Sequence, residues 1–382
     1  MNNTIKVLVA LSSFGLLLFA WESKAARFPV TGQVFFNLQT TEKSNAESVS
    51  QTRISKWKFQ TGGSVYASPA VANGVVYFGS YDDKLYAVDA SAGQEKWNLK
   101  TGGRVLSQPA VADNTVYFGS QDNYLYAADA RTGQQKWRFK TEYAVISAPV
   151  VAGGAVYFGG TDGTLYAIDA VKGTRLWQFH PATGVPSSPV LVGDTVYLGY
   201  AGGLYALDRQ SGQKNWIFKT ASPVISAPAF GNEMLYFGSL DGTLYAVNAA
   251  SGQEVWRFKT GGGVPFTPAV APFGLVYSGS LDGYLYAVEA KTGQEAWKWK
   301  APNGVTSSPV VAGDTVHFGS VKGLYAVDAE SGQERWEFKT EHTVTSSPRA
   351  AGGVVYFGSW DGALYAVQTS PAKYAKDAKN IN

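Results

Sequence analysis

A set of aspartates recurs at regular spacing and is the most conspicuous candidate for chemistry in this sequence. Carboxylates repeated in this way could act as metal ligands or as acid–base groups. Each of them, however, stands four residues before a glycine, in a segment typical of a tight turn. Asp side chains in such turns accept hydrogen bonds from nearby backbone amides. We therefore interpret them as structural residues: Asp89, Asp129, Asp169, Asp208 and Asp328.

The remaining groups with chemical capacity form no pattern typical of an active site. The chain has three histidines, His180, His317 and His342, and no cysteine, which excludes disulfides and thiolate zinc sites. Glycine-rich segments at 61–63 and 101–103 lack the following Lys-Ser/Thr and the helix that a phosphate loop requires. The sequence thus predicts no catalytic residue, no cofactor site and no metal site.

These residues lie in a unit of about 40 residues that recurs along most of the chain, a period typical of solenoids and propellers. Proline and a Leu-Tyr-Ala triplet recur with the same period as tryptophan. The marker tryptophans, spaced by 39 to 41 residues, are Trp57, Trp97, Trp137, Trp177, Trp216, Trp256, Trp297 and Trp336. Eight copies of one supersecondary unit are therefore expected to stack on one another.

Each unit predicts four short strands, which we call A to D. In the first unit they are expected at 65–71, 75–80, 85–90 and 95–100, joined by short turns rich in Gly, Asn and Asp. Strand A carries a proline, such as Pro69, which suits the edge of a sheet. The predicted fold is all-β: an eight-bladed β-propeller of four-stranded antiparallel blades.

The two ends of the repeat region predict how the ring closes. Trp57 precedes the first strand A, whereas the eighth unit ends at Leu364–Val367 without a strand D. Residues 54–60 are therefore expected to supply the outer strand of the eighth blade, which leaves no open ring edge. In such a ring His180 and His342 lie on opposite sides, too far apart to share a zinc ion.

The chain divides into four predicted parts: a signal peptide at 1–25, a linker at 26–53, the propeller at 54–370 and a polar tail at 371–382. Lys6, the uncharged stretch 7–21 and Ser23-Lys24-Ala25 are typical of a cleaved secretory signal. The alternative, a retained membrane anchor, is disfavoured because spanning a bilayer takes about 20 apolar residues. We expect a periplasmic or secreted protein.

Composition and charge exclude further classes. An apolar content of 45% argues against disorder, and a net charge of +3 predicts no strong attraction to nucleic acid. We expect a monomer that associates with a membrane only through a partner.

The motif Ala-x-Asp-x-x-x-Gly-x-x-x-Trp, as at Ala87, Asp89, Gly93 and Trp97, resembles the tryptophan-docking repeat of quinoprotein (PQQ-type) propellers. That superfamily includes PQQ-dependent dehydrogenases and non-catalytic propellers of the BamB type, which take part in outer-membrane β-barrel assembly. The chain has eight compact repeats and no vicinal cysteine pair, and in both respects it is more similar to the second group. The chain also lacks the lipid-anchor cysteine of BamB-type proteins.

The resemblance implies a non-catalytic, protein-binding scaffold. A quinone-binding relative of the dehydrogenases and a carbohydrate-binding propeller remain as alternatives.

Departures from the repeat indicate where a partner could bind. The D–A and B–C connections share one face, which we call the top face, and most B–C tips there are apolar. Aromatic and apolar residues on one surface favour protein contacts, although such tips can also pack on neighbouring loops. Arg104 and Tyr143 depart from the repeat nearby. The predicted site for a protein or extended peptide is an arc of Tyr81, Tyr200, Leu240, Leu281, Trp360, Phe266 and His342.

Overall fold

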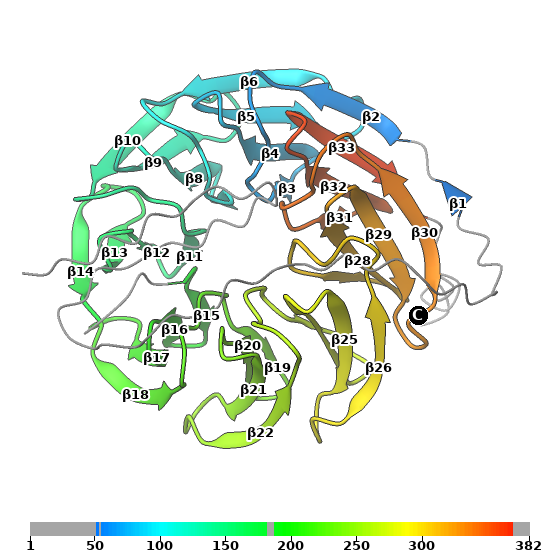
Figure 1. Cartoon of the computed structure of the whole chain (residues 1–382). Coiled ribbons are helices and arrows are strands. Elements are labelled where there is room, and N and C mark those ends of the chain that lie inside the picture. The colour runs from blue at the N-terminus through cyan, green and yellow to red at the C-terminus, as the bar shows by residue number, and fades with distance from the viewer. Residues whose placement is uncertain (1–50, 53–54, 182–186, 370–382) are drawn as a thin grey trace, which may run out of the picture.

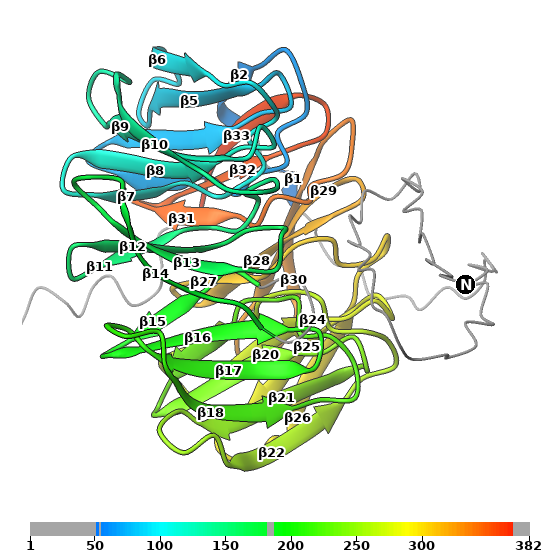
Figure 2. The same cartoon turned by 90° about the vertical axis from the view of Figure 1, so that its left-hand side faces the viewer.

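The computed structural model describes residues 51–52, 55–181 and 187–369, and within them every regular element is a β-strand. The strands form eight sheets arranged as blades around a ring, which confirms the predicted eight-bladed propeller (Figure 1). Seen from the side, the sheets of neighbouring blades lie face to face (Figure 2). The predicted signal peptide, the tail and nearly all of the linker lie outside the described residues.

Blades one to four follow the chain in order, each running from the innermost to the outermost strand. Blade one contains β3 (Ala70–Ala72), β4 (Val75–Gly79), β5 (Lys84–Asp89) and β6 (Glu95–Lys100). Blade two contains β7 (Ala110–Ala112), β8 (Thr115–Gly119), β9 (Tyr124–Asp129) and β10 (Gln135–Lys140). Blade three contains β11 (Val150–Ala152), β12 (Ala155–Gly159), β13 (Leu165–Asp169) and β14 (Arg175–Phe179). Blade four contains β15 (Val190–Val192), β16 (Thr195–Tyr200), β17 (Gly203–Asp208) and β18 (Lys214–Lys219).

Blades five to eight repeat this order, and the last differs in its outer strand. Blade five contains β19 (Ala229–Gly231), β20 (Met234–Gly238), β21 (Thr243–Asn248) and β22 (Glu254–Lys259). Blade six contains β23 (Ala269–Val270), β24 (Leu275–Gly279), β25 (Tyr284–Glu289) and β26 (Glu295–Lys300). Blade seven contains β27 (Val310–Ala312), β28 (Thr315–Ser320), β29 (Gly323–Asp328) and β30 (Glu334–Lys339). Blade eight contains β31 (Arg349–Ala351), β32 (Val354–Gly358), β33 (Ala363–Gln368) and β2 (Ser55–Gln60).

The innermost strands are shorter than the sequence indicates, so the predicted bounds of strand A, 65–71, are wrong although the strand itself is present. In blade one the strand starts only after Pro69, at Ala70. The Val65 amide donates instead to the Ser359 carbonyl of blade eight, at 3.0 Å. The Val65 side chain fills the space over Gly358, where an added Cβ would come within 2.3 Å of it. This segment therefore joins two blades rather than pairing within one.

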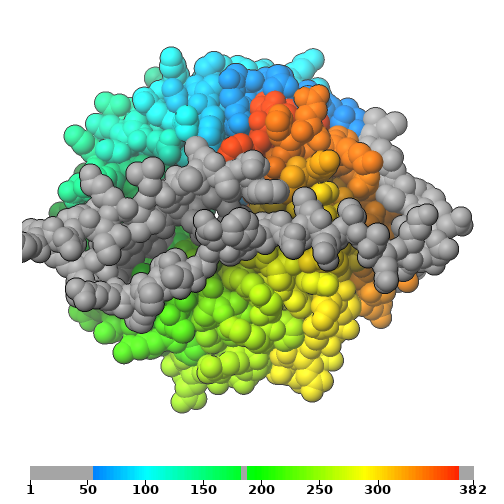
Figure 3. All heavy atoms as spheres, viewed as in Figure 1, coloured from blue at the N-terminus to red at the C-terminus, as the bar shows by residue number. Residues whose placement is uncertain are grey.

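The N-terminal strand β2 closes the ring, as predicted. It pairs antiparallel with β33, in a register that sets Ser55 opposite Val367 and Gln60 opposite Ala363. In Figure 3 the earliest described residues, in blue, touch the latest ones, in red and orange. The first and the last strand of the ring, β2 and β33, are thus joined in one sheet.

A short strand before β2 was not predicted. β1 (Gln51–Thr52) pairs parallel with β30, opposite Trp336 and Glu337, and makes blade seven five-stranded. The end of the predicted linker therefore adds to the outer edge of blade seven before the chain enters blade eight.

The hydrophobic core is divided among the interfaces between neighbouring blades. Between blades one and two, for example, Leu85 packs with Val105, Val116 and Phe118, all fully buried. Burying apolar side chains in this way is the dominant favourable term in folding. Because each blade contributes to two such cores, the ring holds its loops in fixed relative positions.

Candidate functional site on the top face

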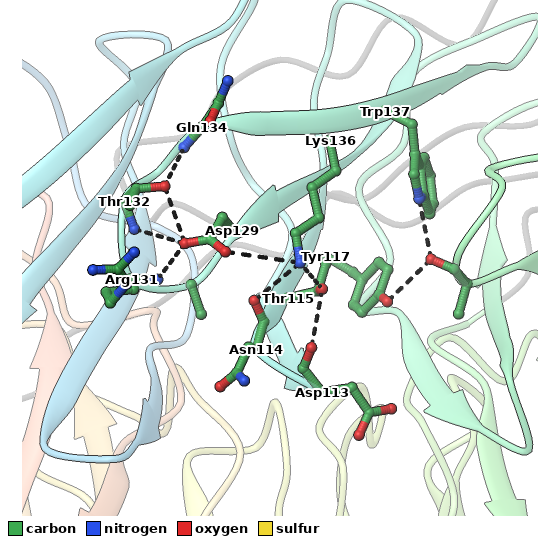
Figure 4. Close-up of polar contacts among 12 residues, drawn as sticks. Asp113, Asn114, Thr115, Tyr117, Asp129, Arg131, Thr132, Gln134, Lys136 and Trp137 are labelled. Carbon is green, nitrogen blue, oxygen red and sulfur yellow. Dashed lines mark hydrogen bonds and ion pairs between the residues drawn. The ribbon is translucent and has the colours of Figure 1, made fainter.

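The recurring aspartates hold their own turns, on the face opposite the predicted site. Asp129 Oδ1 accepts hydrogen bonds from the amides of Arg131, at 3.1 Å, and Thr132, at 2.9 Å (Figure 4). The Thr132 amide and hydroxyl, in that order, hold the pKa of Asp129 below its usual value. This geometry confirms the structural role expected from the sequence.

Each turn also receives the tryptophan of the preceding blade. Trp137 Nε1 donates to the Ala170 carbonyl at 3.0 Å, and the hydroxyl of Tyr117 donates to the same oxygen at 3.2 Å. Figure 4 shows both donors reaching this carbonyl from blade two. Sequence reasoning anticipated the tryptophan but missed the tyrosine, although a tyrosine recurs at the third position of strand B.

In blade seven this tyrosine is replaced by His317, and the tyrosine's hydrogen bond to the next blade is lost. His317 is completely buried against the ring of Trp336, with centroids 5.3 Å apart. Neither of its ring nitrogens has a hydrogen-bond partner among the described residues. Burial, aided by the charge of Arg335, lowers its pKa to about 3, so the ring is neutral at pH 7.

A second set of aspartates, at the B–C turns, fastens the loops of the top face. Asp82 Oδ2 accepts from the Tyr86 hydroxyl at 2.7 Å and from the Gly62 amide at 2.9 Å. Burial, followed by this hydrogen bond, raises the pKa of Tyr86. Sequence reasoning read these residues only as hairpin formers and missed their link to strand C. The same pair occurs as Tyr126–Asp122, Tyr166–Asp162, Tyr245–Asp241, Tyr286–Asp282 and Tyr365–Asp361.

Backbone hydrogen bonds place the D–A and B–C connections on one face, as expected. The Tyr81 amide donates to the Ser64 carbonyl at 2.9 Å, and the Val105 amide donates to the Ser80 carbonyl at 3.2 Å. Each D–A loop therefore contacts the B–C turn of its own blade and that of the preceding blade.

Two of the predicted site residues are buried rather than displayed on this face. Tyr200 is 6% exposed, because the B–C turn of blade four is one residue shorter and Tyr200 remains within β16. It packs on Tyr205, with ring centroids 4.3 Å apart. Phe266 is 9% exposed and occupies the inward-facing position held by Ala67 in blade one. Neither side chain is available to a partner in this conformation.

The other five predicted residues lie at the surface in three places. Leu240 and Leu281, at the tips of blades five and six, are half-buried, and the Leu240 backbone and the Leu281 side chain both lie next to Gly263. His342 is exposed, and its carbonyl accepts a hydrogen bond from Ser359 Oγ at 3.2 Å. Tyr81 and Trp360, the tips of blades one and eight, are half-buried and in ring contact at 6.0 Å.

Tyr81 and Trp360 meet a third ring that the sequence did not single out. Tyr66 lies 6.3 Å from each of them, measured between ring centroids. We call these three residues the aromatic corner. Tyr66 comes from the segment between strands D and A, whose path toward the ring centre could not be read from the repeat alone.

Hydroxyl groups near the ring centre link neighbouring blades. Ser188 Oγ accepts from the Ala148 amide at 2.8 Å, Ser308 Oγ from the Thr267 amide at 3.0 Å, and Ser68 Oγ from the Ser347 amide at 2.9 Å. These side chains are thus used to satisfy backbone donors.

The described part of the chain offers no group of three or more His, Asp or Glu side chains placed to hold a metal ion. His180 Nδ1 lies 2.9 Å from Thr164 Oγ1. The described residues contain no helix long and apolar enough to cross a bilayer.

Comparison with solved structures identifies the same fold in proteins of different kinds. BamB from Moraxella catarrhalis aligns with a TM-score of 0.74 at 19% identity, covering 83% of this chain and 99% of that chain. Sqt1 from Saccharomyces cerevisiae aligns with a TM-score of 0.74 at 15% identity, covering 84% and 100%. A europium-containing methanol dehydrogenase aligns with a TM-score of 0.68 at 16% identity, covering 84% and 95%. At these identities the likeness concerns the fold alone.

Among curated proteins, no sequence matched. The sequence model of the family described as outer membrane protein assembly factor BamB, in contrast, matches residues 41–144, 110–234 and 240–370. These three matches span nearly the whole repeat region and agree with the tryptophan-docking turns seen in the structure. The chain therefore belongs to the outer membrane protein assembly factor BamB family of PQQ-type propellers.

Proposed function

We propose that the protein is a non-catalytic scaffold of the cell envelope that binds a protein or peptide partner through its top face. The observation that carries this proposal is the pair of half-buried leucines, Leu240 and Leu281, at adjacent blade tips on a rigid ring. Apolar side chains fixed at the surface can bury area against a partner without a large cost of ordering.

Family membership and the chemistry of the ring centre support a binding role. Members of this family are described by a role in outer membrane protein assembly, and we transfer to this chain the envelope location and the partner binding. The central hydroxyls of Ser68, Ser188 and Ser308 already accept backbone hydrogen bonds. A quinone site that uses calcium would need carboxylate ligands there.

The proposal is tested with the double variant Leu240→Ser/Leu281→Ser. The matched control is Val171→Ser, because Val171 is 83% exposed and lies in a C–D turn on the opposite face. Both proteins are used as bait in cross-linking of the native envelope, with quantitative mass spectrometry of the captured proteins. A partner that is captured by the wild type and by the control, and is lost with the double variant, is the expected result.

Two outcomes would contradict the proposal. Capture that is identical for the wild type and the double variant would exclude the leucine pair as a contact. Oxidation of methanol or a sugar by the purified chain, after incubation with PQQ and Ca²⁺, would favour the enzyme alternative.

A further inference from the structure

The aromatic corner is a built arrangement rather than a chance meeting of surface residues. The ring planes of Tyr66, Tyr81 and Trp360 are inclined to one another by 44°, 71° and 51°. All three side chains are half-buried. Trp360 is further fixed by its Nε1, which donates to Thr345 Oγ1 at 2.7 Å. Inclined rings that are held in place present aromatic faces in more than one direction.

A cation accompanies the corner. The guanidinium carbon of Arg104, from blade two, lies 4.6 Å from the centroid of the Tyr81 ring. Arg104 is exposed and forms no ion pair with any described residue. A guanidinium that is stacked on an aromatic ring and has no carboxylate partner keeps N–H donors free for an anion.

The corner also carries two phenol hydroxyls. Those of Tyr66 and Tyr81 have no hydrogen-bond partner among the residues that the structure describes. Burial, followed by the neighbouring Tyr81, raises the pKa of Tyr66 to about 12, so this hydroxyl keeps its proton and can donate at neutral pH. The corner therefore combines apolar faces, hydroxyls and one positive charge.

The backbone around the corner has few groups left for a peptide. The Tyr81 amide is bonded to the Ser64 carbonyl, and the Trp360 amide to the Thr343 carbonyl, at 2.9 and 3.0 Å. The Trp360 carbonyl accepts from Ser64 Oγ at 3.0 Å. An extended peptide needs partners for its own amides and carbonyls, and these main-chain groups are already paired. An ammonium ligand is disfavoured too, because Arg104 would repel it.

We propose that the aromatic corner and Arg104 bind an acidic saccharide, with a sugar ring on the aromatic faces and its carboxylate on the guanidinium. The C–H groups of a pyranose ring carry partial positive charge and are attracted to the negative face of an aromatic ring. Its hydroxyl groups match the free phenol groups of Tyr66 and Tyr81. This ligand goes beyond the proposed protein scaffold, and it uses a different part of the top face from the leucine pair.

The test is titration calorimetry of the full chain with two acidic tetrasaccharides, one of galacturonic acid and one of alternating glucuronic acid and N-acetylglucosamine. The methyl ester of the galacturonate tetramer keeps the sugar ring and removes the charge. At least one acid is expected to bind. Arg104→Gln is expected to weaken that binding about tenfold, as loss of one charge-assisted contact does. The ester is expected to bind the wild type about as weakly as the acid binds this variant.

Matched controls separate the corner from general surface effects. Arg138 lies over Tyr124 at 4.4 Å on the outer side of blade two, so Arg138→Gln removes a similar pair elsewhere. Tyr143 is 56% exposed on the same face as the corner, so Tyr143→Ala removes an aromatic ring outside it. Both controls are expected to bind like the wild type, whereas Trp360→Phe is expected to weaken binding. Circular dichroism is recorded for every variant.

Three outcomes would overturn the proposal. One is no binding of either acid at millimolar concentration. Another is equal binding of the acid by the wild type and by Arg104→Gln. The Arg104 side chain is exposed, so this substitution should not prevent folding. The third is selective binding, by the wild type but not by Trp360→Phe, of an aromatic peptide with a free carboxyl terminus in place of the saccharides.

Discussion

His317 shows how a single residue departs from the repeat. In blade six the equivalent Tyr277 donates to the Ala329 carbonyl at 2.8 Å, 52 positions along the chain. The same offset from His317 leads to Thr369, where the eighth unit ends without a C–D turn. The histidine thus faces blade eight, and among the described residues the interface between blades seven and eight lacks the recurrent Asp-turn.

The buried neutral histidine makes stability depend on pH in a definite direction. Its pKa is about 3 in the folded chain, against 6.5 when unfolded. As the pH falls below 6.5, only the unfolded chain takes up the proton, so stability is lost between about pH 6.5 and pH 3. Arg335 bonds to Asp314 at 2.6 Å and to Asp328. The pKa values of both carboxyl groups are lowered, so their own titration affects stability only at lower pH.

The variant His317→Tyr is therefore expected to be less sensitive to acid than the wild type. Between pH 7 and pH 5 the wild type should lose about 2 kcal/mol through this histidine, and the variant should not. The measurement is the free energy of unfolding in urea at both pH values. Tyr277→His serves as the opposite control and should add a similar loss. The same pH dependence in the wild type and His317→Tyr would contradict the assignment.

At the scale of the element, each turn is shaped to receive the tryptophan of the preceding blade. Gly173 has a φ of +69°, and a Cβ added there would lie 2.7 Å from the Trp137 ring. Gly74 has a similar φ of +73° in an A–B turn, but nothing lies within 4 Å of its added Cβ. The two glycines thus share the backbone requirement and differ in the contact.

Substituting the two glycines separates the energetic cost of backbone strain from the cost of disturbing the contact with the tryptophan. Gly74→Ala should cost about 1–2 kcal/mol of stability, the penalty of left-handed backbone for a residue with a side chain. Gly173→Ala should cost a further 1–3 kcal/mol or so, because the methyl group displaces a packed ring. Urea unfolding of both variants provides the measurement. Equal losses of stability in the two variants would show that the Trp137 ring can move aside at no energetic cost.

The repeat predicted those elements well whose residues act within a single turn or strand of one unit. The periods of tryptophan and proline gave the blades, and Asp-x-x-x-Gly gave the turns. Strand A was predicted too long because Val65 bonds across to blade eight, which a single unit cannot reveal. The sequence predicts Tyr200 and Phe266 at the surface because both are aromatic residues assigned to the connections of the top face. The loop of blade four is one residue shorter, and Phe266 stands at an inward-facing position.

The aromatic corner marks the limit of sequence reasoning about the site. Tyr81 and Trp360 were identified as tips, yet they lie 279 positions apart and meet only because the ring closes between blades eight and one. Tyr66 and Arg104 join them from two different D–A connections. Their contact depends on distances between blades, which the order of residues in one blade does not specify.

At the scale of the whole molecule, closure by β2 sets both stability and the site. Trp57 Nε1 donates to the Ala90 carbonyl at 3.1 Å, and Phe59 packs on Phe78 and Tyr86 with centroids 5.9 and 5.5 Å away. One strand of blade eight is therefore also bonded to blade one. The aromatic corner spans the same seam on the top face, so its geometry depends on this strand.

Deletion of residues 54–60 should consequently destabilise the ring far more than deletion of 371–382, which removes no residue that the structure describes. The first deletion removes two half-buried aromatic rings that pack on blade one and leaves β33 as an open edge prone to aggregation. Thermal unfolding compares the melting temperatures of the two truncated proteins, and size-exclusion chromatography reports association. A synthetic peptide of residues 51–61, added to the first protein, should restore part of the lost melting temperature by pairing with β33. Equal melting temperatures for the two deletions would mean that the ring holds without its closing strand, and the seam would then not be what fixes the aromatic corner.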